Sequence, residues 1–238
     1  MSTYVLVHGA YHGAWCYAKV VPLLQAAGHT AVAVDLPGHG DNPVPRKQIT
    51  LDAYVDHVCR VIDAQSEPVI LVGHSLGGVT VSQVAEKRPD KVKTLVFLAA
   101  LMPLDGESRF DLSKRVEENS SAADARVPTD DGLASAVRDD FIVPLFYGDC
   151  SEEDISFAKA RLVPQAIAIL ETQVHLSEQC YGSVPRVYIE CLQDGAIPIK
   201  MQRRMVAAAP CEKVLTLDTS HSPFFSAPEK LTEFLLIL

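Results

Sequence analysis

A serine between glycines follows a run of apolar residues in the stretch VILVGHSLGG, residues 69–78. A strand that turns sharply into a helix holds one side chain out at the carboxyl edge of a parallel sheet, and the turn strains the backbone. The residues two before and two after the exposed one must be small, and here they are Gly73 and Gly77. We therefore predict that Ser75 is a nucleophile. The alternative is a glycine-rich turn in which Ser75 only caps a helix.

A serine nucleophile needs a histidine base, which an acid usually orients. At a turn of this kind the three residues follow the order serine, acid, histidine. Asp194 ends the apolar run VYIECLQD, and His221 lies just after the run KVLTLD. If both runs are strands of one parallel sheet, their carboxyl ends bring the three side chains to the same edge. The sequence thus predicts a triad of Ser75, Asp194 and His221.

The other acids and histidines fit different roles. Asp218 is too close in sequence to His221 to orient it easily, and Glu190 lies in mid-strand, where its side chain points into a face of the sheet. Structural or surface roles are expected for four histidines outside the first loop, which are His29, His57, His74 and His175.

Two backbone N–H groups should hold the oxyanion that forms when a nucleophile attacks a carbonyl. Leu76 supplies one of them, because it follows the nucleophile at the start of a helix. The loop HGAYHGAW at 8–15 supplies the second, with Ala10 as the candidate donor. We expect His8 and His12 to hold this loop in place through hydrogen bonds.

The elements that must position these residues follow from the apolar pattern. Strand-like runs with apolar residues on both faces alternate with helical patterns, which predicts a parallel sheet covered by helices on both sides. Thr50 is the expected N-cap of one helix. Strands are predicted at 3–9, 30–40, 68–73, 91–101, 186–194 and 213–221. Helices are predicted at 14–28, 50–65, 75–87, near 198–208 and near 225–237.

The strand rhythm is lost between residues 103 and 183, which are polar, charged and helix-like in pieces. We interpret 103–183 as a helical cap inserted into a core formed by 1–102 and 184–238. The cap should enclose a largely apolar substrate pocket, although core packing is the commoner role of any single phenylalanine. The segment AIAIL belongs to the candidate lining, together with His12, Phe141, Phe146 and Phe224.

Composition restricts the partners. The formal net charge of −9 argues against a nucleic-acid partner, which requires a basic face. The longest apolar stretch contains Lys93 and is too short to span a bilayer. The amino terminus has no basic segment and no room for a cleaved signal peptide before the first strand. We expect a cytoplasmic protein, or one exported by a segment outside this sequence; a homodimer is left open.

The six cysteines are widely spaced and have no neighbouring histidine pairs, so a zinc site is poorly supported. Reduced and mostly buried thiols are expected, with one disulfide left open. The proposed serine chemistry also needs no metal or organic cofactor.

Several motifs together resemble the α/β-hydrolase superfamily: LVHGAYHGAW, VDLPGHG, GHSLGG, YIECLQDGAIP and TSHSPFFSAPEKL. More narrowly, the chain is similar to the plant methylesterase and hydroxynitrile lyase group and to its bacterial esterase relatives, including pyrethroid-type carboxylesterases. The similarity extends nearly end to end. It implies a mostly parallel sheet of about six strands, with the cap inserted after the sixth-strand position. It also implies the roles given above for Ser75, Asp194, His221, Ala10 and Leu76.

This group contains two chemistries. The lyases have threonine at the position of Gly9, GESCGG in place of GHSLGG, and lysine in place of Ser222. All three differences favour ester hydrolysis. Ser222 also departs from the methionine of many methylesterases, which leaves the preferred ester open. The sequence predicts a serine carboxylesterase for small-to-medium esters; the alternatives are a cyanohydrin-cleaving lyase and a slow-turnover ligand receptor.

Overall fold

A computed structural model of the chain describes residues 1–116 and 125–238. Its centre is a sheet of six parallel strands in the order β2-β1-β3-β4-β8-β9. The strands are β1 (Thr3–Val7), β2 (Thr30–Val34), β3 (Val69–His74), β4 (Val92–Leu98), β8 (Arg186–Cys191) and β9 (Lys213–Leu217). All six predicted strands are confirmed; β3 is as long as its predicted run, and the other five are shorter.

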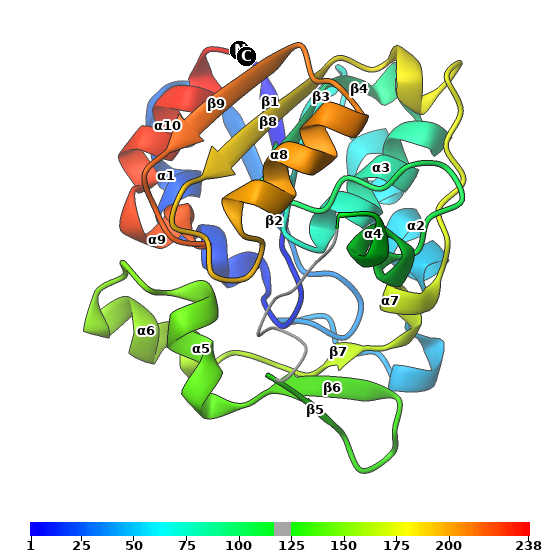
Figure 1. Cartoon of the computed structure of the whole chain (residues 1–238). Coiled ribbons are helices and arrows are strands. Elements are labelled where there is room, and N and C mark those ends of the chain that lie inside the picture. Colours follow the sequence, from blue (N-terminus) through cyan, green and yellow to red (C-terminus); the bar gives the residue numbers. More distant parts are fainter. Residues whose placement is uncertain (117–124) are drawn as a thin grey trace.

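Helices cover both faces of this sheet (Figure 1). One face carries α1 (Val20–Ala26), α9 (Pro223–Ser226) and α10 (Pro228–Leu236). The opposite face carries α2 (Leu51–Asp63), α3 (Gly77–Lys87) and α8 (Ile199–Ala208). Single 3-10 turns are η1 (Ala14–Tyr17), η2 (Arg46–Gln48), η3 (Pro89–Lys91) and η4 (Tyr181–Ser183). The predicted three-layer α/β architecture is confirmed.

The continuous apolar strands follow from this layering. Successive side chains point to opposite faces, so a strand covered on both sides must be apolar throughout. In β1, Val5 and Val7 belong to the core beneath α2 and α3, whereas Tyr4 and Leu6 belong to the core beneath α1 and α10. Each face of the sheet therefore has its own hydrophobic core.

Two predicted helices are divided. The run 14–28 forms the 3-10 turn η1 and then α1, whose first turn contains Pro22. The last helix is divided into α9 and α10 at Pro228. Proline cannot donate a backbone hydrogen bond and is best tolerated in the first turn of a helix, so α10 begins at Pro228 and α1 begins two residues before Pro22.

The segment between β4 and β8 contains α4 (Arg109–Arg115), α5 (Asp139–Phe146), α6 (Glu152–Lys159) and α7 (Ala168–Glu171). It also contains a small antiparallel sheet of β5 (Arg126–Pro128), β6 (Ala134–Val137) and β7 (Gln165–Ala166). Part of this segment, from β5 to α6, lies beyond the carboxyl ends of the strands, whereas the chain after α7 returns along the side of the sheet to η4 beside α3 (Figure 1). The cap contains helices as expected, but its three strands were not predicted, because strands this short leave no alternating pattern in the sequence. Its boundaries at 103 and 183 stay a prediction.

All six cysteines are free thiols. Cys16, Cys59 and Cys191 are buried, and the other three are partly buried. Within 1–116 and 125–238, no helix combines the length and apolar character needed to cross a membrane.

The hydroxyl of Thr50 accepts a hydrogen bond of 3.1 Å from the N–H of Ala53 at the start of α2, as its sequence position predicts. Because Thr50→Ala leaves that N–H without its partner, we expect it to lower the free energy of unfolding by about 1 kcal/mol. Urea denaturation measures the difference. Thr50→Ser keeps the hydroxyl and should stay close to wild type, and equal midpoints for Thr50→Ala and wild type would contradict the assignment.

Candidate active site

Ser75 lies between β3 and α3 with a positive φ of 52°. This left-handed conformation is rare for a residue other than glycine and is costly unless its surroundings hold it. The Ser75 carbonyl accepts hydrogen bonds from Gly78 (3.1 Å) and Leu101 (2.9 Å), and its N–H donates to Leu98 (3.2 Å). The strand–turn–helix geometry expected around Ser75 is therefore present.

The glycines on either side of Ser75 are required by close packing. A Cβ atom on Gly73 would lie 2.5 Å from a methyl group of Val81, and one on Gly77 would lie 2.6 Å from the carbonyl oxygen of His8. Both separations are too short for carbon against its neighbours. The backbone of α3 thus lies directly against the loop that follows β1.

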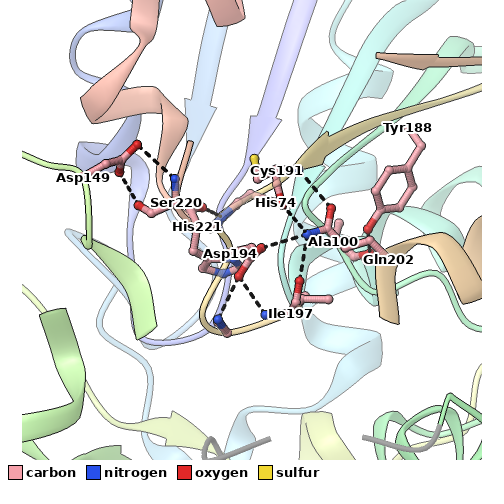
Figure 2. A network of polar contacts seen from close by, with 11 residues as sticks. His74, Ala100, Asp149, Tyr188, Cys191, Asp194, Ile197, Gln202, Ser220 and His221 are labelled. Atoms are coloured by element: carbon pink, nitrogen blue, oxygen red, sulfur yellow. Dashed lines mark hydrogen bonds and ion pairs between the residues drawn. The ribbon is translucent and has the colours of Figure 1, made fainter. Parts of the chain in front are cut away.

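Asp194 and His221 form a buried pair at the same edge of the sheet (Figure 2). Nδ1 of His221 lies 2.7 Å from Oδ2 of Asp194. The side chain of His221 is 1% exposed and that of Asp194 is 0% exposed. Oδ1 of Asp194 also accepts from the N–H groups of Ala196 (2.8 Å) and Ile197 (2.7 Å). These donors fix the carboxylate so that it can orient the imidazole.

Gln202 is a polar residue of α8 that the sequence analysis did not identify. Its amide nitrogen donates to Oδ2 of Asp194 (3.3 Å) and to the carbonyls of Cys191 (3.0 Å) and Ile197 (2.7 Å) (Figure 2). Gln202 is completely buried. In the sequence, Gln202 could be noticed only as an amide on the apolar side of a predicted helix near Asp194. This position indicates burial, but it does not show which groups the amide contacts.

His74 lies next to His221, with 4.5 Å between the ring centroids. Its Nε2 donates a hydrogen bond of 2.9 Å to the carbonyl of His221, and its side chain is completely buried. A structural or surface role was expected for His74. Its contact is with the backbone of the His221 loop.

The loop after β1 is held by its own histidines. Nδ1 of His8 donates to the carbonyl of Gly9 (2.7 Å), and Nδ1 of His12 donates to the carbonyl of Ala10 (2.8 Å). Among the described residues, the N–H groups of Ala10 and Leu76 donate to no other group. These two N–H groups can therefore serve a bound oxyanion.

Ser75 and His221 line one cavity of about 620 Å³, part of which opens to solvent. Within the described ranges, neither the Ser75 hydroxyl nor Nε2 of His221 forms a hydrogen bond with the protein. Both groups are thus available to a molecule in the cavity. The other lining residues include Ala10, His12, Leu76, Leu101, Arg109, Arg126, Leu145, Phe146, Leu170 and Ile197.

The predicted pocket residues divide into two pairs. Phe146 and His12 line the cavity, whereas Phe141 and Phe224 do not. Phe224 is completely buried and packs edge-on against His74 (centroids 4.9 Å apart). Phe141 lies under the guanidinium of Arg138. Assigning Phe141 and Phe224 to the pocket was wrong, because an apolar side chain near a site can equally face the core.

The rival acids lie elsewhere. Asp218 is exposed and accepts from Gln193 (2.9 Å), while Glu190 pairs with Arg203 (2.9 Å). Neither of the two acids is hydrogen-bonded to His221.

Four histidines beside the site are held neutral by burial. Burial lowers the pKa of His12 to about 3 and that of His39 to about 4. Burial also lowers the pKa of His8 and His74 well below the ordinary value, and neighbouring histidines add to the effect. Nδ1 of His39 donates to the carbonyl of His12 (2.6 Å), so the neutral rings still form hydrogen bonds.

These pKa values predict acid lability. In the unfolded chain each of these histidines binds a proton below about pH 6.5, whereas in the folded protein each stays neutral to lower pH. Protons therefore favour the unfolded state, and each histidine steepens the loss of stability by up to about 1.4 kcal/mol per pH unit. We expect the free energy of unfolding to fall from about pH 6.5 to about pH 5. Urea denaturation across this range measures it.

His12→Gln supplies the control, because glutamine takes up no proton in either state. The slope of unfolding free energy against pH should become shallower by about one bound proton. An unchanged slope would show that His12 titrates alike in both states.

The model of the alpha/beta hydrolase family matches residues 4–234 of this chain. Methylesterase 1 of Arabidopsis thaliana is 35% identical over 247 residues, which cover 98% of this chain and 94% of that protein. The alpha-hydroxynitrile lyase of the same plant is 35% identical over 244 residues, which cover 98% and 95%. The relatives of this chain thus include both an esterase and a lyase, the two chemistries of the group that the sequence resembles.

Solved structures agree. Polyneuridine aldehyde esterase superposes with a TM-score of 0.90 at 29% identity, covering 100% of this chain and 98% of that one. A pyrethroid hydrolase from Sphingobium faniae JZ-2 gives 0.88 at 30% identity, covering 99% and 96%. Together with the family match and the six-stranded parallel sheet, these similarities show that the chain belongs to the alpha/beta hydrolase family.

Proposed function

We propose that this protein is a serine carboxylesterase in which Ser75 attacks the ester carbonyl. The carrying observation is the buried hydrogen bond of 2.7 Å between His221 and Asp194, in a site where His221 and Ser75 line one cavity. A histidine oriented by a carboxylate is the base that a serine nucleophile needs. The methylesterase relatives support an enzyme that hydrolyses esters.

The reaction follows from this arrangement. Oγ of Ser75 bonds to the carbonyl carbon while its proton moves to Nε2 of His221. Asp194 stays ionised, holds the imidazole tautomer and stabilises the imidazolium. The N–H groups of Ala10 and Leu76 hold the oxyanion, which contributes about 2.7–4 kcal/mol per donor in a comparable protease.

The intermediate then collapses. The bond to the leaving alcohol breaks, and His221 gives its proton to the alcohol oxygen. Water next attacks the acyl carbon on Ser75 while His221 takes up the water proton. The bond between this carbon and Oγ of Ser75 then breaks, His221 returns the proton to Oγ, and the carboxylic acid leaves. The apolar part of the cavity favours small-to-medium acyl and alkyl groups, and the methylesterase relatives favour a small leaving alcohol.

Two observations support hydrolysis over cyanohydrin cleavage. A Cβ atom on Gly9 would lie 2.6 Å from Cβ of Ser75 and 3.0 Å from Nδ1 of His74, so this loop has no room for the lyase threonine. The residue after His221 is Ser222, which is completely buried and carries no positive charge for a departing cyanide.

Ser75→Ala removes the nucleophile, so we expect it to lower kcat for p-nitrophenyl acetate and butyrate by about a thousandfold or more. Ser66→Ala, at an exposed serine, should leave kcat unchanged. Hydrolysis is followed by p-nitrophenolate release, and cyanide release from mandelonitrile is assayed in parallel.

Each contrary result names an alternative. Cyanide release that depends on Ser75 would establish the lyase. A folded wild-type protein with neither activity would favour the ligand receptor.

A further inference from the structure

We propose that one turn of the cap, residues 147–149, positions both halves of the catalytic machinery. Tyr147 holds the oxyanion loop through His12, and Asp149 holds the His221 loop through Ser220. The proposal rests on the proposed function, because it assigns Tyr147 and Asp149 as positioning residues for ester hydrolysis. The turn follows α5 directly, so both contacts come from one short stretch of the cap.

The first arm is a chain of buried hydrogen bonds with one consistent direction. The Ala10 carbonyl can only accept, so Nδ1 of His12 carries the proton in their bond of 2.8 Å. His12 is neutral, because burial lowers its pKa to about 3, and its Nε2 is therefore an acceptor. The Tyr147 hydroxyl, 2.7 Å away, must donate to it.

These two hydrogen bonds, from Tyr147 to His12 and from His12 to Ala10, hold a loop that needs support from outside. The Ala10 carbonyl belongs to the peptide that leads into Tyr11, which has a positive φ of 68°. Such a conformation persists only when its surroundings hold it. The cap supplies a second hydrogen bond to this loop, from the N–H of Val163 to the Tyr11 carbonyl (3.0 Å). The Ala10 N–H itself lies in the preceding peptide, whose Gly9 carbonyl is held by His8 (2.7 Å). The cap therefore holds the two peptides that follow the donor, and through them it supports the position of the Ala10 N–H.

The second arm holds the residue before His221 (Figure 2). The Asp149 carboxylate accepts from the Ser220 N–H (2.9 Å) and from the Ser220 hydroxyl. Asp149 is exposed, but Ser220 is buried. A carboxylate that accepts two hydrogen bonds holds a loop more firmly than a neutral acceptor does.

The neighbouring residues of the His221 loop are anchored from the core. The Thr219 carbonyl accepts from Gln193 (2.9 Å), and the His221 carbonyl accepts from His74 (2.9 Å). Ser220 is the position anchored from the cap. A shift of the turn would thus move the base and the oxyanion donors together, and a misplacement of about 1 Å can cost about a hundredfold in rate.

Steady-state kinetics of Tyr147→Phe and Asp149→Ala with p-nitrophenyl butyrate test both arms. Each variant keeps the cavity lining intact but loses one arm. We expect kcat to fall about 10- to 100-fold while KM stays within about twofold. A boronic acid that forms a tetrahedral adduct with Ser75 should bind correspondingly more weakly.

Three further variants separate positioning from general damage. Asp149→Asn can accept from the Ser220 N–H and donate to its hydroxyl, so it should recover most of the lost kcat. Asp149→Ala combined with Ser220→Ala should resemble Asp149→Ala alone, because both remove the same contact. Arg46→Ala breaks another cap–core ion pair, Arg46–Asp131 (2.9 Å), which involves no residue of either loop, and it should keep wild-type kcat.

NMR gives a readout that does not require turnover. The proton on Nδ1 of His221 should exchange with solvent faster in Asp149→Ala than in wild type or Arg46→Ala. Wild-type kcat in both Tyr147→Phe and Asp149→Ala, or an equal loss in Arg46→Ala, would overturn the proposal. If wild type shows no Ser75-dependent hydrolysis, the proposed function fails, and the exchange rate alone decides whether Asp149 holds His221.

Discussion

The strained backbone of Ser75 is the constraint on which the rest of the site depends. A positive φ at a serine persists only if the surrounding contacts outweigh its cost, which is on the order of 1–3 kcal/mol. Those contacts are the hydrogen bonds of its N–H and carbonyl and the approach of α3 to the loop after β1. That approach requires glycine at 77. The strain therefore connects the sheet, α3 and the first loop in one arrangement.

The buried Asp194 carboxylate is the second constraint on the site, because it must be supplied with hydrogen-bond donors. Burying a charge is costly unless it is paired and hydrogen-bonded, and its four donors come from its own loop, from α8 and from His221. Gln202 extends this network, because its amide also accepts from the Cys191 N–H (3.1 Å) and donates to two carbonyls. The end of β8 and the start of α8 are thus joined around the carboxylate.

Much of the core was predictable because the strands are covered on both faces and so leave continuous apolar runs. The turn at Ser75 was predictable because its glycines have fixed spacing. Gln202 and Asp149 were not, because each acts through a partner distant in sequence, and only the fold brings them together. The strands of the cap were not predicted for another reason. β5 spans three residues and β7 only two, which is too short to show an alternation of apolar and polar residues. The assignment of Phe141 and Phe224 to the pocket was wrong because a sequence does not show which way an apolar side chain faces.

The histidines around the site show how the fold selects one base among several imidazoles. His8, His12, His39 and His74 are buried without a carboxylate partner, so each stays neutral and donates its single ring proton to a backbone carbonyl. His221 differs because its Nδ1 faces Asp194 and its Nε2 faces the cavity that holds Ser75. A proton released by Ser75 therefore meets stabilisation at His221 and a desolvation cost at His74, although the two rings are 4.5 Å apart. The position of a single buried carboxylate is thus sufficient to decide which histidine can act as the base.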